Sequence, residues 1–96
     1  MDVHTENIKM YINDIRKNMA KIRSWRHLEK TYDTKYALTQ LLTNIYESSL
    51  ETDIEFPRKL AITRRLASHV YQKVDFYIVY NLCKELMEMK FDDQNT

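Results

Sequence analysis

The chain has 96 residues, a net charge of +1, no glycine and one proline. Glycine supplies the positive φ angles of tight hairpins and lets backbone approach phosphate closely. Its absence therefore excludes Walker-type and dinucleotide-binding loops and argues against a hairpin-rich β fold. A composition of 44% hydrophobic and 30% charged residues is typical of one small globular domain, here spanning residues 1–96.

The sequence also predicts where in the cell the protein is located. No apolar run approaches the roughly 20 residues of a membrane span, and the first residues lack the apolar segment of a signal peptide. The single cysteine, Cys83, cannot form an internal disulfide. These features predict a cytoplasmic protein.

The first helix is predicted from about residue 3 to the mid-20s. Its apolar residues recur at spacings of three and four and so form one stripe, which Trp25 and Leu28 extend. A polar connection is predicted over Glu29–Lys35, where Asp33 or Thr34 could cap the next helix. That second helix carries a leucine-rich stripe from Leu38 to Tyr46.

The third helix is predicted to begin at Pro57, because proline suits the first turn of a helix. A break is predicted near residues 72–74. The fourth helix is then predicted from Phe76 to about Met89 with Asp75 as its cap, followed by a short frayed tail over residues 91–96.

These elements predict an all-α fold, an antiparallel up-down-up-down four-helix bundle. Net charge supports this arrangement, because it is positive over residues 1–30, negative over 31–56, positive over 57–75 and negative over 76–96. The predicted core contains Ile8, Ile12, Ile15, Met19, Ile22, Leu38, Leu41, Leu42, Ile45, Leu60, Leu66, Val70, Phe76, Val79, Leu82, Cys83 and Leu86.

Residues with the spacing of a catalytic or metal site are missing from the sequence. The histidines His4, His27 and His69 are far apart, and Cys83 lies in an apolar run where cysteine is usually a core residue. We therefore expect no enzyme activity, no metal and no cofactor.

Two surfaces remain as candidates for binding. Arg58, Lys59, Arg64 and Arg65 could form a basic face for nucleic acid or anionic lipid, or could be solvated and paired with acidic segments. The run Phe76–Cys83 is apolar around nearly its whole circumference. Tyr77 and Tyr80 could therefore stay exposed for a partner or could widen the core.

The order of features over residues 34–90 resembles a known family. A leucine-rich helix ends at Tyr46, an acidic loop precedes Pro57, and a capped helix begins at Phe76; between them lie Arg64-Arg65-Leu66 and Val70-Tyr71, and the last helix ends in Lys84-Glu85-Leu86. This order is similar to that of the enterocin A immunity family, cytosolic proteins of Gram-positive bacteria that protect a producer from its own pediocin-like bacteriocin.

The resemblance implies a non-enzymatic four-helix bundle without a cofactor, acting at the inner membrane face. Its partner would be a mannose phosphotransferase permease with bound bacteriocin. Specificity would lie in the last helix and tail, which here correspond to Tyr77, Tyr80, Lys84, Met87 and residues Phe91–Thr96.

Two other interpretations stay open. The chain could be a small helical regulator, from a phage, virus or bacterium, that binds nucleic acid or a transcription factor through the basic third segment. It could also be a subunit of a helical assembly, with Phe76–Cys83 as its dimer face.

Overall fold

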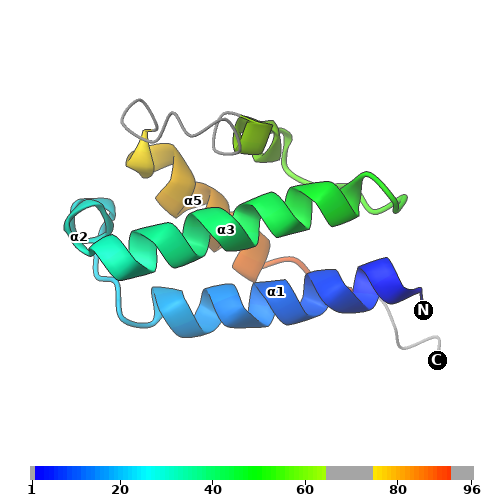
Figure 1. Ribbon diagram of the computed structural model, residues 1–96, viewed down its shortest axis with the longest axis horizontal. Coiled ribbons are helices and arrows are strands. Elements are labelled where there is room, and N and C mark those ends of the chain that lie inside the picture. The colour runs from blue at the N-terminus through cyan, green and yellow to red at the C-terminus, as the bar shows by residue number, and fades with distance from the viewer. Residues whose placement is uncertain (1, 65–74, 92–96) are drawn as a thin grey trace.

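The computed structural model describes residues 2–64 and 75–91, and within them the protein is all-α without a strand. The elements are α1 (Val3–Met19), α2 (Trp25–Lys30), α3 (Tyr32–Ser49), the 3-10 helix η1 (Arg58–Ile62) and α5 (Phe76–Met87). Figure 1 shows α1 and α3 side by side, running in opposite directions, with α5 behind them. The predicted all-α, antiparallel bundle class is confirmed.

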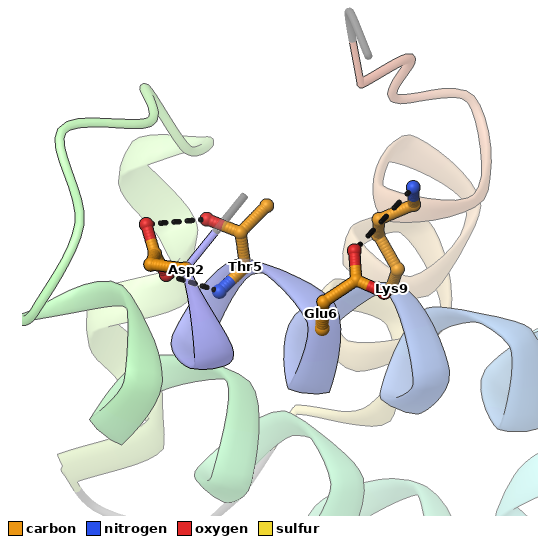
Figure 2. Close-up of polar contacts among 4 residues, drawn as sticks. All are labelled: Asp2, Thr5, Glu6 and Lys9. Carbon is orange, nitrogen blue, oxygen red and sulfur yellow. Dashed lines mark hydrogen bonds and ion pairs between the residues drawn. The ribbon is translucent and has the colours of Figure 1, made fainter. Parts of the chain in front are cut away.

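Helix α1 begins where a side chain caps it. The Asp2 carboxylate accepts hydrogen bonds from the backbone N–H of Thr5 at 2.7 Å and from the Thr5 hydroxyl at 3.2 Å (Figure 2). The hydrogen bond from the Thr5 N–H stabilises the charged carboxylate and lowers the pKa of Asp2 below its ordinary value. The cap satisfies one of the N–H groups that a helix start leaves without an intrahelical partner.

Helix α1 ends earlier than the periodicity predicts, at Met19 instead of in the mid-20s. Ser24 has extended backbone, and its hydroxyl accepts a hydrogen bond from His27 N–H at 3.2 Å, so it caps a separate helix, α2. The apolar stripe continues across this break, because Ile22 and Leu28 are both buried. Periodicity alone therefore could not detect the break.

The connection predicted over Glu29–Lys35 is helical on both sides of a single residue, Thr31. Thr31 leaves the helical conformation, and its hydroxyl donates a 2.8 Å hydrogen bond to the His27 carbonyl, which closes the last turn of α2. The predicted caps Asp33 and Thr34 lie inside α3 instead. One non-helical residue is enough to redirect the chain here.

The facing stripes of α1 and α3 supply nearly half of the buried apolar residues described, and Leu38, Leu42 and Ile45 are fully buried as predicted. Leu41 is a correction, because it is only partly buried and packs against the edge of the core. Its neighbour Leu42 is one position further around the helix and takes the central place. The buried apolar residues form one cluster: Ile8, Ile12, Ile15, Met19, Ile22, Leu28, Leu38, Leu42, Ile45, Leu60, Phe76, Val79, Leu82, Cys83 and Leu86.

The segment after Pro57, predicted as the start of an α-helix, begins instead as the 3-10 helix η1, and α-helical conformation follows at Thr63 and Arg64. Pro57 precedes the helix as its N-cap, and Leu60 is buried as predicted. The next residue, Ala61, is exposed. The predicted core positions Leu66 and Val70 lie outside the described residues.

Helix α5 begins as predicted, with the Asp75 carboxylate accepting a 2.9 Å hydrogen bond from Tyr77 N–H. It ends at Met87, slightly before the predicted Met89. Phe76, Val79, Leu82, Cys83 and Leu86 are buried along one side, so this helix closes the core over α1 and α2.

Candidate functional site

Three tyrosines are more than half exposed at one end of the molecule: Tyr32 at 75%, Tyr36 at 56% and Tyr77 at 53%. This is the end where α2 contacts both α3 and α5, and Figure 1 shows the first turns of α3 and α5 beside α2. We call the aromatic surface the group formed by Trp25, Tyr32, Tyr36, Tyr77 and Tyr80 together with the cations Arg26, Lys35 and Lys84. Large exposed aromatic groups at one place are typical of an interaction surface.

Two rings of the aromatic surface contact each other. The rings of Trp25 and Tyr77 meet edge to face, with centroids 5.8 Å apart and an interplanar angle of 89°. This is a favourable arrangement for two aromatic quadrupoles. The contact joins α2 to α5 and fixes one side of the aromatic surface.

Lys35 connects the other elements of this end. Its Nζ atom donates a 3.1 Å hydrogen bond to the Glu29 carbonyl of α2. The same atom lies 5.4 Å from the ring centroid of Tyr32 and 5.1 Å from that of Phe76, both within cation–π range. One ammonium group therefore ties α2, α3 and α5 together.

The exposed side of α5 continues the surface. Tyr77, Tyr80 and Lys84 are spaced at three, then four residues, so they share one face of the helix. Tyr80 is half-buried, and the Lys84 ammonium lies 5.6 Å from its ring centroid. The exposure predicted for the two tyrosines of the Phe76–Cys83 run differs between them, because Tyr77 is exposed whereas Tyr80 is half-buried and packs against the core.

The residues predicted to bind a partner do not form one group. Met87 lies at the far end of α5, about 15 Å along the helix from Tyr77 at a rise of roughly 1.5 Å per residue, and Phe91 lies in the segment that follows. There the Met87 carbonyl accepts a 2.7 Å hydrogen bond from Arg16 of α1, and Phe91 is half-buried. Only Tyr77, Tyr80 and Lys84 belong to the aromatic surface.

Sequence reasoning missed Trp25, Tyr32 and Tyr36 as parts of this surface. Tyr32 and Tyr36 were placed in or beside a polar connection, although their spacing of four residues would align them on a helix. Trp25 was treated as an extension of the core stripe. If the second helix had been predicted to begin at Tyr32, Tyr32 and Tyr36 would have been placed on one face of it.

The predicted basic face is divided. Arg58 and Lys59 are exposed in η1. Arg64 contacts α3 instead, because its Nε donates a 2.7 Å hydrogen bond to the Tyr46 hydroxyl and its guanidinium lies 5.9 Å from that ring centroid. Arg65 lies outside the described residues.

The side chains that could take part in catalysis or bind a metal have structural roles instead. Cys83 is buried in the core, and burial raises the pKa of its thiol to about 12, which disfavours the reactive thiolate. His27 Nδ1 accepts a 3.1 Å hydrogen bond from Arg23 N–H at the start of α2. Within residues 2–64 and 75–91, no three His, Cys, Asp or Glu side chains gather as a metal site would require.

None of the helices in the described ranges is long and apolar enough to cross a bilayer. Comparison of the chain with protein-family models, curated proteins and solved structures finds no match. The resemblance to the enterocin A immunity family therefore stays a prediction, and the functional argument depends on the geometry of the aromatic surface.

Proposed function

We propose that this chain is a small helical binding protein that contacts a partner protein through the aromatic surface. The observation that carries the proposal is the exposure of Tyr32, Tyr36 and Tyr77 at the one end where α2, α3 and α5 meet. Tyrosine, tryptophan and arginine are the residue types that most often dominate the free energy of protein association. A tyrosine ring offers apolar area while its hydroxyl stays hydrated in the free protein.

The rigidity of this surface supports the proposal. The Trp25–Tyr77 contact and the contacts of Lys35 restrict the rings before a partner arrives. Ordering a mobile side chain at an interface costs about 0.5–1.5 kcal/mol, so rings already held in place bind with a smaller entropic cost. Such a surface is suited to specific recognition.

For the partner, we propose the one implied by the resemblance, a membrane receptor of the mannose phosphotransferase type to which a pediocin-like bacteriocin has bound. In this proposal the chain acts at the inner face of the membrane and protects the cell by contact alone. Tyr77, Tyr80 and Lys84 of α5 touch the receptor complex, and Trp25, Tyr32 and Tyr36 extend the contact across α2 and α3.

The test is a challenge with a panel of pediocin-like bacteriocins in a sensitive Gram-positive host that expresses the chain. The aromatic triple variant Tyr32→Ser/Tyr36→Ser/Tyr77→Ser is compared with the aliphatic variant Val3→Ser/Met10→Ser/Leu50→Ser. The control removes three side chains that are equally exposed, at 63%, 63% and 66%, but lie away from the aromatic surface. Circular dichroism verifies that both variants keep their helices.

We expect protection from the unaltered chain and from the aliphatic variant, and loss of protection in the aromatic variant. Protection that survives in the folded aromatic variant would contradict the binding site. Sensitivity of cells with the unaltered chain to every toxin would contradict the proposed partner.

A separate measurement distinguishes the nucleic-acid alternative. Binding of the chain to duplex DNA and to single-stranded RNA is measured from about 50 to about 200 mM salt, a range over which phosphate contacts lose most of their affinity. Salt-sensitive binding that Arg58→Gln/Lys59→Gln removes would favour the regulator. We expect no specific binding of either nucleic acid at any salt concentration in this range.

A further inference from the structure

The charge of the chain is least evenly distributed where α1 ends and α2 begins. Residues 15–28 contain five Lys or Arg and no Asp or Glu, which leaves ten Lys or Arg and fourteen Asp or Glu in the rest of the chain. Figure 1 shows this segment at one end of the molecule, as the last turns of α1, a short connection and α2. A net charge near zero therefore conceals one basic end on an otherwise acidic chain.

Four of the five basic side chains are exposed and have no hydrogen bond to another element: Lys17, Lys21, Arg23 and Arg26. We call these four residues the basic patch. The fifth, Arg16, is held elsewhere, because it donates a 2.7 Å hydrogen bond to the Met87 carbonyl at the end of α5. The basic patch shares Arg26 with the aromatic surface, so the two surfaces are adjacent.

The charge of the basic patch is not neutralised within the described residues. None of its side chains forms an ion pair there, although Asp14 and Glu29 flank the segment in the sequence. Nearer the start of α1, by contrast, the Lys9 ammonium lies 3.8 Å from the Glu6 carboxylate (Figure 2). Cations without a partner in the free chain are available to an anionic surface and also steer its approach.

The contacts of the neighbouring aromatic residues favour a lipid surface over a nucleic acid. Single-stranded nucleic acid binds by stacking its bases on open aromatic faces. Here the Arg26 guanidinium lies 5.2 Å from the Trp25 ring centroid, and the same ring meets Tyr77 edge to face. Tryptophan and tyrosine beside Lys and Arg are typical of surfaces that lie at the headgroup level of a membrane.

We propose that the basic patch binds the anionic headgroups of a membrane surface. Its four cations pair with lipid phosphates, and the adjacent aromatic surface stays free for the receptor. The inference rests on the proposed function for its setting, the inner membrane face, where anionic lipids attract basic segments. Each Lys or Arg near such a surface raises the affinity about fivefold, so the contact is weak and reversible by itself. It adds to the receptor contact by keeping the chain close to the membrane.

The test is flotation of the full chain with vesicles of equal parts phosphatidylglycerol and phosphatidylcholine, and with vesicles of phosphatidylcholine alone. We expect binding to the anionic vesicles only, and a bound fraction that falls as salt rises from about 50 to about 200 mM, because mobile ions screen the charges. No binding to the anionic vesicles, or equal binding to both kinds, would overturn the proposal.

The vesicles contain no receptor, so this result is separate from the bacteriocin challenge. Protection of cells by a chain that does not bind anionic vesicles would remove the lipid contact and leave the receptor proposal in place. Binding to the vesicles by a chain that protects against no toxin would support the lipid contact and contradict the proposed receptor.

Two variants with the same loss of charge locate the contact. Lys21→Gln/Arg23→Gln removes half of the basic patch without changing the aromatic surface, and about a tenfold or greater loss of affinity for the anionic vesicles is expected. Arg58→Gln/Lys59→Gln removes two exposed cations of η1 and is expected to change that affinity by less than about twofold. Circular dichroism verifies that both variants keep their helices.

Two further outcomes would contradict the assignment. Equal losses in the two variants would show that net charge, and not the basic patch, governs binding. Tighter binding of the chain to single-stranded RNA or duplex DNA than to the anionic vesicles, compared at equal phosphate concentration, would assign the basic patch to nucleic acid instead.

Discussion

The middle of α3 and its first turns lie in different environments. Along α1 and the middle of α3, aliphatic side chains such as Ile12 and Leu42 are sealed from water, at 1% and 0% exposure. At the first turns of α3, Tyr32 and Tyr36 are mostly exposed and are accompanied by the Lys35 ammonium. The aliphatic region gains stability from area removed from water, about 25 cal/mol per Å². The first turns of α3 gain less stability in this way, because their tyrosine side chains stay exposed. That exposed area is the area that the proposed partner would cover.

The contrast also holds around the circumference of α5. Leu82, Cys83 and Leu86 are fully buried, whereas Tyr77, Tyr80 and Lys84 lie on the other side of the same helix. One helix therefore serves both the core and the candidate surface. Substitutions on the buried side are expected to lower the free energy of unfolding, whereas substitutions on the exposed side are expected to weaken binding of the proposed partner.

The largest expected effect concerns the closed side of α5. Cys83 is fully buried, so a thiol reagent can reach it only when the helix opens. Labelling of the native chain is expected to be slower than labelling of the urea-unfolded chain by about a thousandfold or more, which corresponds to the opening free energy of a small domain. Fast labelling of the native protein would show that α5 does not seal the core as described.

The next effect compares two adjacent leucines of α3. Leu42→Ala removes a fully buried side chain and is expected to lower the free energy of unfolding by about 2–5 kcal/mol. Leu41→Ala removes a partly buried side chain at the edge of the core, and roughly half that loss or less is expected. Urea unfolding measures both, and equal losses would contradict the different burial of the two positions.

A smaller effect is expected at the aromatic end. Lys35→Met keeps the length of the side chain but removes the hydrogen bond to the Glu29 carbonyl and the cation–π contacts with Tyr32 and Phe76. A loss of about 1–2 kcal/mol in unfolding free energy is expected. Lys17→Met, on the exposed side of α1, is the control and is expected to change stability by less than about 0.5 kcal/mol. Similar values for the two variants would mean that Lys35 does not join the elements.

The smallest effect is a pH dependence at the start of α1. The Thr5 hydrogen bond lowers the pKa of Asp2 from its ordinary value of 3.8, so the charged cap stabilises the folded state above that pH. The stabilisation is lost as the pH falls through the lowered pKa, because the folded carboxyl then takes up its proton. The difference in melting temperature between the unaltered chain and Asp2→Ala should therefore narrow in acid, whereas a constant difference would assign the effect of the variant to packing.

The sequence was sufficient for elements whose apolar period and caps agree. The stripe from Ile8 to Met19 and the Asp75 cap of α5 were both predicted and are both present. It was insufficient at both ends of α2. The apolar stripe continues past the end of α1, and the polar stretch predicted as a connection is helical on both sides of Thr31. Across the first break the apolar period continues, because Ile22 and Leu28 are both buried although α1 has ended.

The aromatic surface could not be predicted without the two breaks that set α2 apart as a separate helix. Tyr77 and Tyr80 were proposed from their position in an overly apolar helix, but no pattern in the sequence relates them to Tyr32. Their proximity follows from the short helix α2, which packs on both α3 and α5. The contact between Trp25 and Tyr77 joins residues 52 positions apart and is set by tertiary structure alone.

The most direct test of the central claim measures where the partner covers the chain. Amide hydrogen exchange of the chain is recorded with membranes that contain the proposed partner, the mannose phosphotransferase permease, with and without a pediocin-like bacteriocin. Toxin-dependent slowing of exchange is predicted in residues 25–36 and 76–84, with α1 unaffected. Slowing centred on residues 3–14 or 58–64 instead, or no slowing anywhere, would contradict the assignment of the aromatic surface as the binding site.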